Sequence, residues 1–215
     1  MKRALLSTAL LLALTAPLGA MLKHIERVTP RIAQRGTTVE ISIRGTHLDD
    51  PKEIIFDRPG IRAEAIGPVT KLPVTGFQHG GRIEAEIKCR LVIAPDCAPG
   101  EHRFRLRTAT QLTSLATFHV TPFPVVDETQ EKNGNDTPAT AQSVPMNVTV
   151  RGRIDGSARG DLDVYRVTAK AGERLSAEVH CARFADVHYG DSEFDLAMRV
   201  LDANGREIAA NDENP

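Results

Sequence analysis

Apolar and polar residues alternate with a period of two through most of this chain. The clearest run is Ile83–Ile93, in which every second residue is apolar. Such alternation places the apolar side chains on one face of a half-buried β-strand. Beyond the first twenty residues, no stretch has the i, i+3, i+4, i+7 spacing of an amphipathic helix. The pattern therefore predicts an all-β fold.

Clusters of Gly, Pro, Asn and Asp separate the alternating runs and indicate turns. We expect strands at His24–Val28, Thr38–Arg44, Glu53–Phe56, Arg62–Ile66, Ile83–Ile93, His102–Arg107, Leu115–Val120, Val148–Ile154, Asp163–Thr168, Arg174–Cys181, Phe194–Leu201 and Arg206–Ala209. Short strands at this spacing are typical of β-sandwiches. Within the last pair, Asn204-Gly205 predicts a tight hairpin turn.

Residues 122–145 interrupt the alternation and predict a domain boundary. This stretch begins with Pro122 and Pro124, which cannot donate to a strand ladder, and continues with polar residues. We expect a first β-sandwich at residues 21–121, a linker leading into the second domain at 122–145, and a second β-sandwich at 146–215.

The first twenty residues have the pattern of a secretory signal peptide. Lys2 and Arg3 precede an apolar run at residues 4–16, and Pro17 and small residues follow it. The run is shorter than the ~20 residues that a membrane span needs. We therefore expect a secreted, periplasmic or cell-surface protein. The net charge of −1 gives no indication of a nucleic-acid partner.

The segment from Ile25 to Asp50, IERVTPRIAQRGTTVEISIRGTHLDD, resembles an immunoglobulin-like IPT/TIG domain. Its Gly36 supplies a turn before a strand whose Val39, Ile41 and Ile43 face inward. The resemblance implies an Ig-like β-sandwich, and such halves occur beside other secreted modules in planctomycete-type bacteria.

The second half resembles a bacterial pre-peptidase C-terminal (PPC) domain. The matching segments are EKNGND (131–136), GDLDVYRV (160–167), KAGERLSAEV (170–179) and DLAMRVLDANGREIAANDENP (195–215). PPC domains continue past this last turn, so the resemblance implies that the final strands are missing. It also implies a non-catalytic module that accompanies an extracellular enzyme.

Calcium is the cofactor that the PPC resemblance implies. Oxygen-bearing side chains crowd the segment 131–136, and Asp161 and Asp163 lie on one face of a predicted strand. Carried over from PPC-like modules, the candidate Ca²⁺ ligands are Glu131, Asn133, Asn135, Asp136, Asp161 and Asp163. Asn133 replaces a second Glu of that pattern, which should weaken the site. The alternative is a solvated linker with two aspartates that cap a turn.

Three cysteines cannot all pair within one chain. Cys89 lies on the apolar face of its strand, and Cys97 lies in a Pro/Gly loop. Export permits a Cys89–Cys97 disulfide, but buried free thiols are common and are the favoured interpretation. His180 and Cys181 would point to opposite faces of a predicted strand and so could not share a metal. The spacing of His180, Cys181 and His188 also matches no zinc pattern.

No catalytic motif is found in the sequence. His79-Gly80-Gly81 is similar to an oxyanion-hole segment, but no G-x-S-x-G elbow accompanies it. We therefore expect a protein that is not an enzyme.

Arg103, Arg105 and Arg107 alternate on one strand and form a candidate surface for an anionic polysaccharide. The stripe would be wider if this strand paired with Ile83–Ile93. Acidic neighbours favour the alternative, which is the solvated face of a sheet.

The sequence thus indicates an exported, non-catalytic β-sandwich module that tethers, positions or stabilises an extracellular enzyme or surface assembly. Its partner would be an extracellular protein or a polysaccharide. Two alternatives remain open: the accessory region of a secreted peptidase or other hydrolase, and a carbohydrate- or matrix-binding module.

Overall fold

A computed structural model describes residues 22–75, 83–129, 134–153, 161–180 and 196–212. Every regular element among these residues is a β-strand, so the predicted all-β class is confirmed. No helix in the described ranges is long and apolar enough to cross a membrane.

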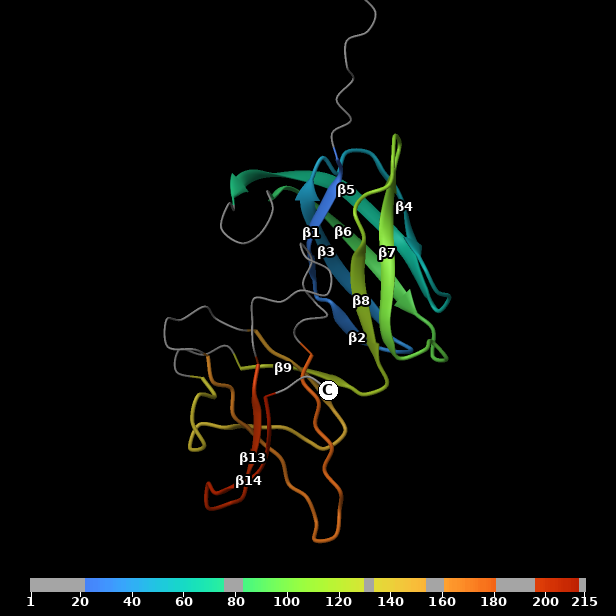
Figure 1. Ribbon diagram of the computed structural model, residues 1–215. Helices are drawn as coiled ribbons and strands as arrows, with labels where there is room; N and C mark the ends of the chain where they lie inside the picture. Colours follow the sequence, from blue (N-terminus) through green and yellow to red (C-terminus); the bar gives the residue numbers. More distant parts are fainter. Residues whose placement is uncertain (1–21, 76–82, 130–133, 154–160, 181–195, 213–215) are drawn as a thin grey trace, which may run out of the picture.

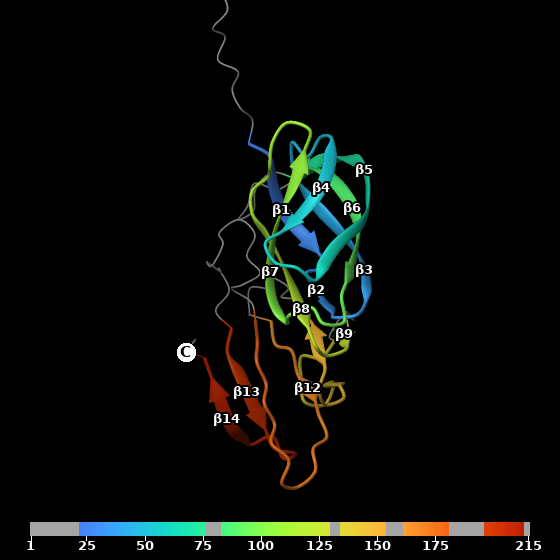
Figure 2. The ribbon, with the colours of Figure 1, turned by 90° about the vertical axis from the view of Figure 1, so that its right-hand side faces the viewer.

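The first eight strands form two four-stranded sheets that face each other (Figures 1 and 2). The order of the first sheet is β1 (His24–Thr29), β3 (Thr38–Thr46), β6 (Ile83–Ile93) and β5 (Ile61–Thr75). The order of the second sheet is β2 (Ile32–Gln34), β8 (Ala116–Thr121), β7 (Gly100–Thr108) and β4 (Pro51–Phe56).

One hydrophobic core lies between these two sheets. It combines Ile41 and Ile87 of the first sheet with Phe104 and Leu106 of the second. Alternation along β6 buries all of its alternating apolar residues except Ile83, which is half-buried, and Cys89 is among the buried ones. The predicted strand Ile83–Ile93 is confirmed with the same bounds.

The later strands form three two-stranded sheets. These are β9 (Val125–Asp127) with β11 (Thr149–Arg151), β10 (Gln142–Ser143) with β12 (Tyr165–Arg166), and β13 (Met198–Leu201) with β14 (Glu207–Asn211). The first two pairs are parallel. The predicted hairpin turn joins β13 to β14, where the Asp202 amide donates to the Arg206 carbonyl at 2.8 Å.

Several strand predictions need correction. Strand β2 was missed, because three residues are too few to show alternation. The predicted linker contains β9 and β10, each of which pairs with a strand far along the chain.

Residues 174–180 were predicted to be part of a strand but form none, since no described segment pairs with them. Leu175 and Val179 are 38% and 49% exposed there rather than on an inner face. A second sandwich of larger sheets therefore stays a prediction.

The segment between the two halves is anchored on both sides. The Gln34 side chain donates to the Pro122 carbonyl at 3.3 Å, and the Thr149 amide donates to the Pro124 carbonyl at 2.9 Å. The hydroxyl groups of Thr121 and Thr149 lie 2.7 Å apart. These bonds hold β9 and β11 directly after the end of β8.

Candidate functional site

The structure brings together the described part of the predicted calcium site. Glu131 and Asn133 lie outside the described residues. The Val164 amide donates to the Asn135 carbonyl at 2.7 Å, so residues 135–136 lie beside residues 161–164. Two segments separated by more than twenty residues thus lie side by side.

Glu128 lies at the centre of this convergence and was not among the sequence candidates. Its residue is only 7% exposed. Asn135 Nδ2 donates to Glu128 Oε1 at 3.2 Å, and the Tyr165 hydroxyl donates to the same oxygen at 2.8 Å. The Arg153 amide donates to Glu128 Oε2 at 2.8 Å. A buried carboxylate is stable only when such donors replace its water.

Asp163 shares a hydrogen bond with Glu128, which places two carboxyl groups in direct contact. Burial, and then the hydrogen bond and charge of Glu128, raise the pKa of Asp163 to about 7; the negative charges of Asp161 and Asp136 add to this effect. Burial alone would raise the pKa of Glu128, but its hydrogen bonds outweigh burial and lower that pKa. The proton that the pair shares therefore resides on Asp163.

Two further residues complete the wall of this carboxylate cluster. A Cβ at Gly152 would lie 3.3 Å from Glu128 Oε2 and 3.4 Å from the Tyr165 hydroxyl, so the glycine permits the close approach of the backbone. Burial and the neighbouring Glu128 raise the pKa of Tyr165, which keeps its hydroxyl a donor at neutral pH.

The chemistry of the cluster is that of a cation or proton site. Two carboxyl groups in contact repel each other when both are ionised, unless a proton or a cation lies between them. Oxygen donors from Glu128, Asp163 and Asn135 suit a hard cation such as Ca²⁺. Across the described ranges, no group of three or more His, Cys, Asp or Glu side chains is arranged to hold a metal ion.

The arginine stripe on β7 is largely paired with carboxylates. Arg103 Nε lies 2.8 Å from Asp57 Oδ2, and Arg107 Nε lies 2.9 Å from Glu53 Oε2. Arg105 donates to the Thr113 carbonyl at 2.6 Å. Because β7 pairs with β4 and β8, and not with β6, the stripe is not widened by the basic residues of β6. Glu53 lies on β4 and Asp57 directly follows it, and neither partner was foreseen.

Two of the three cysteines, Cys89 and Cys97, lie among the described residues. Cys89 and Cys97 are both free and buried, as favoured from the sequence, and Cys181 lies outside the described residues. Burial raises the pKa of Cys89 to about 12 and also raises that of Cys97. Cys97 Sγ lies 3.6 Å from Nε2 of the buried His102. Thiols with raised pKa values are poor nucleophiles.

Comparisons with known proteins give little information about this chain. No family model matches it, and no curated protein matches it. Among solved structures, it is similar to SGBP-B of the Bacteroides ovatus mixed-linkage glucan utilization locus, determined in complex with a mixed-linkage heptasaccharide. The identity is 16%, the TM-score is 0.31, and the match covers 60% of this chain and 26% of that chain. The chain thus spans about a quarter of the length of that structure, and a likeness this weak carries no argument about function.

Proposed function

We propose that this chain is an exported, non-catalytic β-module whose second half is stiffened by Ca²⁺ bound at the carboxylate cluster. The observation that carries the proposal is the convergence of the described candidates on one buried carboxylate. Asn135 and Asp163 both hydrogen-bond Glu128, and Asp136 and Asp161 lie near enough to raise the pKa of Asp163. Acidic residues on a solvated linker would repel one another and would not be expected to cluster around a buried carboxylate.

The position of the cluster suggests what such a cation would do. Glu128 follows β9, and Asp163 precedes β12. A cation held between these residues would tie the segment after β8 to the strands that follow it. Ca²⁺ sites of extracellular modules are commonly weak, with dissociation constants of about 10⁻⁴–10⁻³ M. A site with few carboxylates is compatible with that range.

We propose that the stiffened module positions or tethers an extracellular partner. The Ig-like and PPC resemblances and the signal-peptide pattern support this proposal, and the partner would be an extracellular enzyme or surface assembly. A polysaccharide partner at Arg103–Arg107 is the weaker proposal, because the ion pairs to Asp57 and Glu53 already neutralise much of that stripe.

Calorimetric titration of Ca²⁺ into the chain tests the proposal. We expect saturable binding that is lost in Glu128→Gln and in Asp163→Asn. Glu207→Gln is the matched control, because Glu207 is a carboxylate of the same half that lies on the exposed strand β14. If the chain binds no Ca²⁺, or if all three variants bind it like the unmodified chain, the calcium proposal is wrong.

A further inference from the structure

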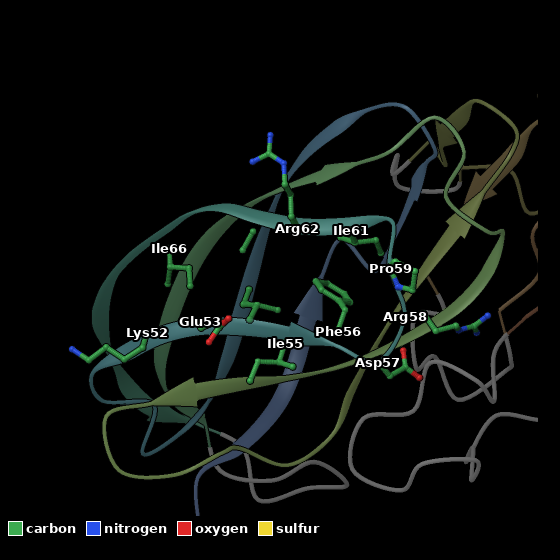
Figure 3. Close-up of a pocket in the computed structure, with 12 residues that line it drawn as sticks. Lys52, Glu53, Ile55, Phe56, Asp57, Arg58, Pro59, Ile61, Arg62 and Ile66 are labelled. Atoms are coloured by element: carbon green, nitrogen blue, oxygen red, sulfur yellow. The ribbon is translucent and has the colours of Figure 1, made fainter.

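A groove lies between the open edges of the two large sheets. Strand β4 is the last strand of one sheet and β5 is the last strand of the other, so each has one edge without a neighbour among the described strands. The turn at residues 57–60 connects the two strands and closes one end of the groove (Figure 3). The cavity has a volume of about 520 Å³.

The walls of the groove combine apolar side chains with strand edges. Phe56, Ile61 and Ile66 line it, and Ile55 on the outer side of β4 is 42% exposed. Figure 3 shows Phe56 reaching from β4 toward β5, with Ile61 and Ile66 on the facing strand. An open strand edge also presents backbone N–H and C=O groups in a row. Backbone donors and acceptors beside apolar side chains are what an extended peptide recognises when it adds to a sheet.

The charges around the groove favour an acidic ligand. Lys52, Arg58 and Arg62 line it together with Glu53 and Asp57. Both of these carboxylates already form ion pairs with arginines of β7.

Among the three cations, Arg58 donates to the carbonyl of Glu101, and its charge helps to lower the pKa of the adjacent Asp57. Arg62 lies 3.7 Å from the exposed Glu64, which is a weak pairing. The groove therefore has a net positive rim.

We propose that this groove binds an extended acidic segment of a partner protein, which adds as a strand to the open edge of β4 or β5. The two faces of an added strand would meet different surroundings. One face would contact Phe56, Ile61 and Ile66, and the other would face solvent and the cations Lys52 and Arg62. Because successive side chains of a strand point to opposite faces, the ligand is a segment in which apolar and acidic residues alternate. This surface belongs to the first half of the chain and is independent of the calcium proposal.

Fluorescence anisotropy with a labelled peptide of alternating valine and aspartate, DVDVDVDVD, tests this inference on the full chain. Two peptides serve as controls. One has lysine in place of every aspartate, and the other carries N-methyl groups at alternate amides and cannot pair with a strand edge. We expect binding of the acidic peptide only, weakened by added salt, with amide chemical-shift changes confined to β4, β5 and the turn between them.

Charge reversal in the protein supplies the second measurement. Lys52→Glu combined with Arg62→Glu should weaken binding about tenfold, since each exposed charge contributes modestly. Arg35→Glu is the matched control, because Arg35 is an exposed cation outside the groove. This variant should bind the peptide like the unmodified chain. Equal binding of the lysine or N-methylated peptide, no binding of the acidic peptide, or an equal effect of Arg35→Glu would overturn the inference.

Discussion

Replacement of Asp163 by asparagine should abolish a pH dependence of local stability in the second half of the chain. The pKa of Asp163 rises from 3.8 in the unfolded chain to about 7 in the folded chain. Between these values the folded state holds a proton that the unfolded state has lost. The free energy of local unfolding around Asp163 therefore falls as the pH rises through this window. The stabilisation contributed by the Asp163 proton is lost above about pH 7.

Glu128 does not cancel this dependence. Its folded pKa is lowered, so its contribution is present above its unfolded pKa of 4.5 and is lost only as the pH falls below that value. The rise in the pKa of Asp163 from 3.8 to about 7 corresponds to about 4 kcal/mol if solvent screening is ignored. Asp163 is only half-buried, so we expect about 1–2 kcal/mol after screening. Above neutral pH, Ca²⁺ should restore the local stability that is lost when Asp163 ionises, because a bound cation stabilises two ionised carboxylates.

Hydrogen exchange at the Val164 amide is the direct assay. This amide donates to the Asn135 carbonyl at 2.7 Å and reports local opening of the site. After correction for the intrinsic exchange rate, protection in the unmodified chain should fall about fivefold to thirtyfold between about pH 5 and pH 8 without Ca²⁺. In Asp163→Asn, the side-chain amide donates to Glu128 at every pH. Protection of the Val164 amide in this variant should therefore depend neither on pH nor on Ca²⁺. A flat profile in the unmodified chain, or the same slope in the variant, would refute the reasoning.

Three further results are expected. Gly45→Ala should lower the free energy of unfolding, measured by urea titration, by about 2–4 kcal/mol. The reason is that the new Cβ would lie 1.9 Å from the His24 carbonyl oxygen and would push β1 away from β3. A free energy of unfolding equal to that of the unmodified chain would contradict this prediction. In a variant whose third cysteine is serine, Cys89 and Cys97 should resist Ellman's reagent until urea unfolds the protein, since burial raises both pKa values; rapid reaction of the native protein would contradict their burial. Arg105→Glu should leave the retention of the protein on a heparin column unchanged. A clear loss of retention would instead support the arginine stripe as a polysaccharide-binding surface.

Sequence alone located the elements whose information is local. Alternation in Ile83–Ile93 gave both the strand and its buried face, because a period of two decides which side chains share a face. The Asn204-Gly205 pair marked a hairpin turn, and Gly205 has the positive φ of 81° that such a turn needs. The two acidic segments are also recognisable in the sequence, whereas the contact between them is a feature of the tertiary structure.

Only the tertiary structure decided which strands pair and which charges meet. Alternation does not encode the neighbours of a strand, so β7 could not be assigned to β4 rather than to β6. Pairing with β4 then brought Asp57 and Glu53 to the arginine stripe. The burial of Glu128 is likewise invisible in a polar segment, because it depends on Tyr165, thirty-seven residues away. Local sequence fixes the face and the turn, whereas the pKa values and ion pairs arise from contacts that exist only after distant segments have packed together.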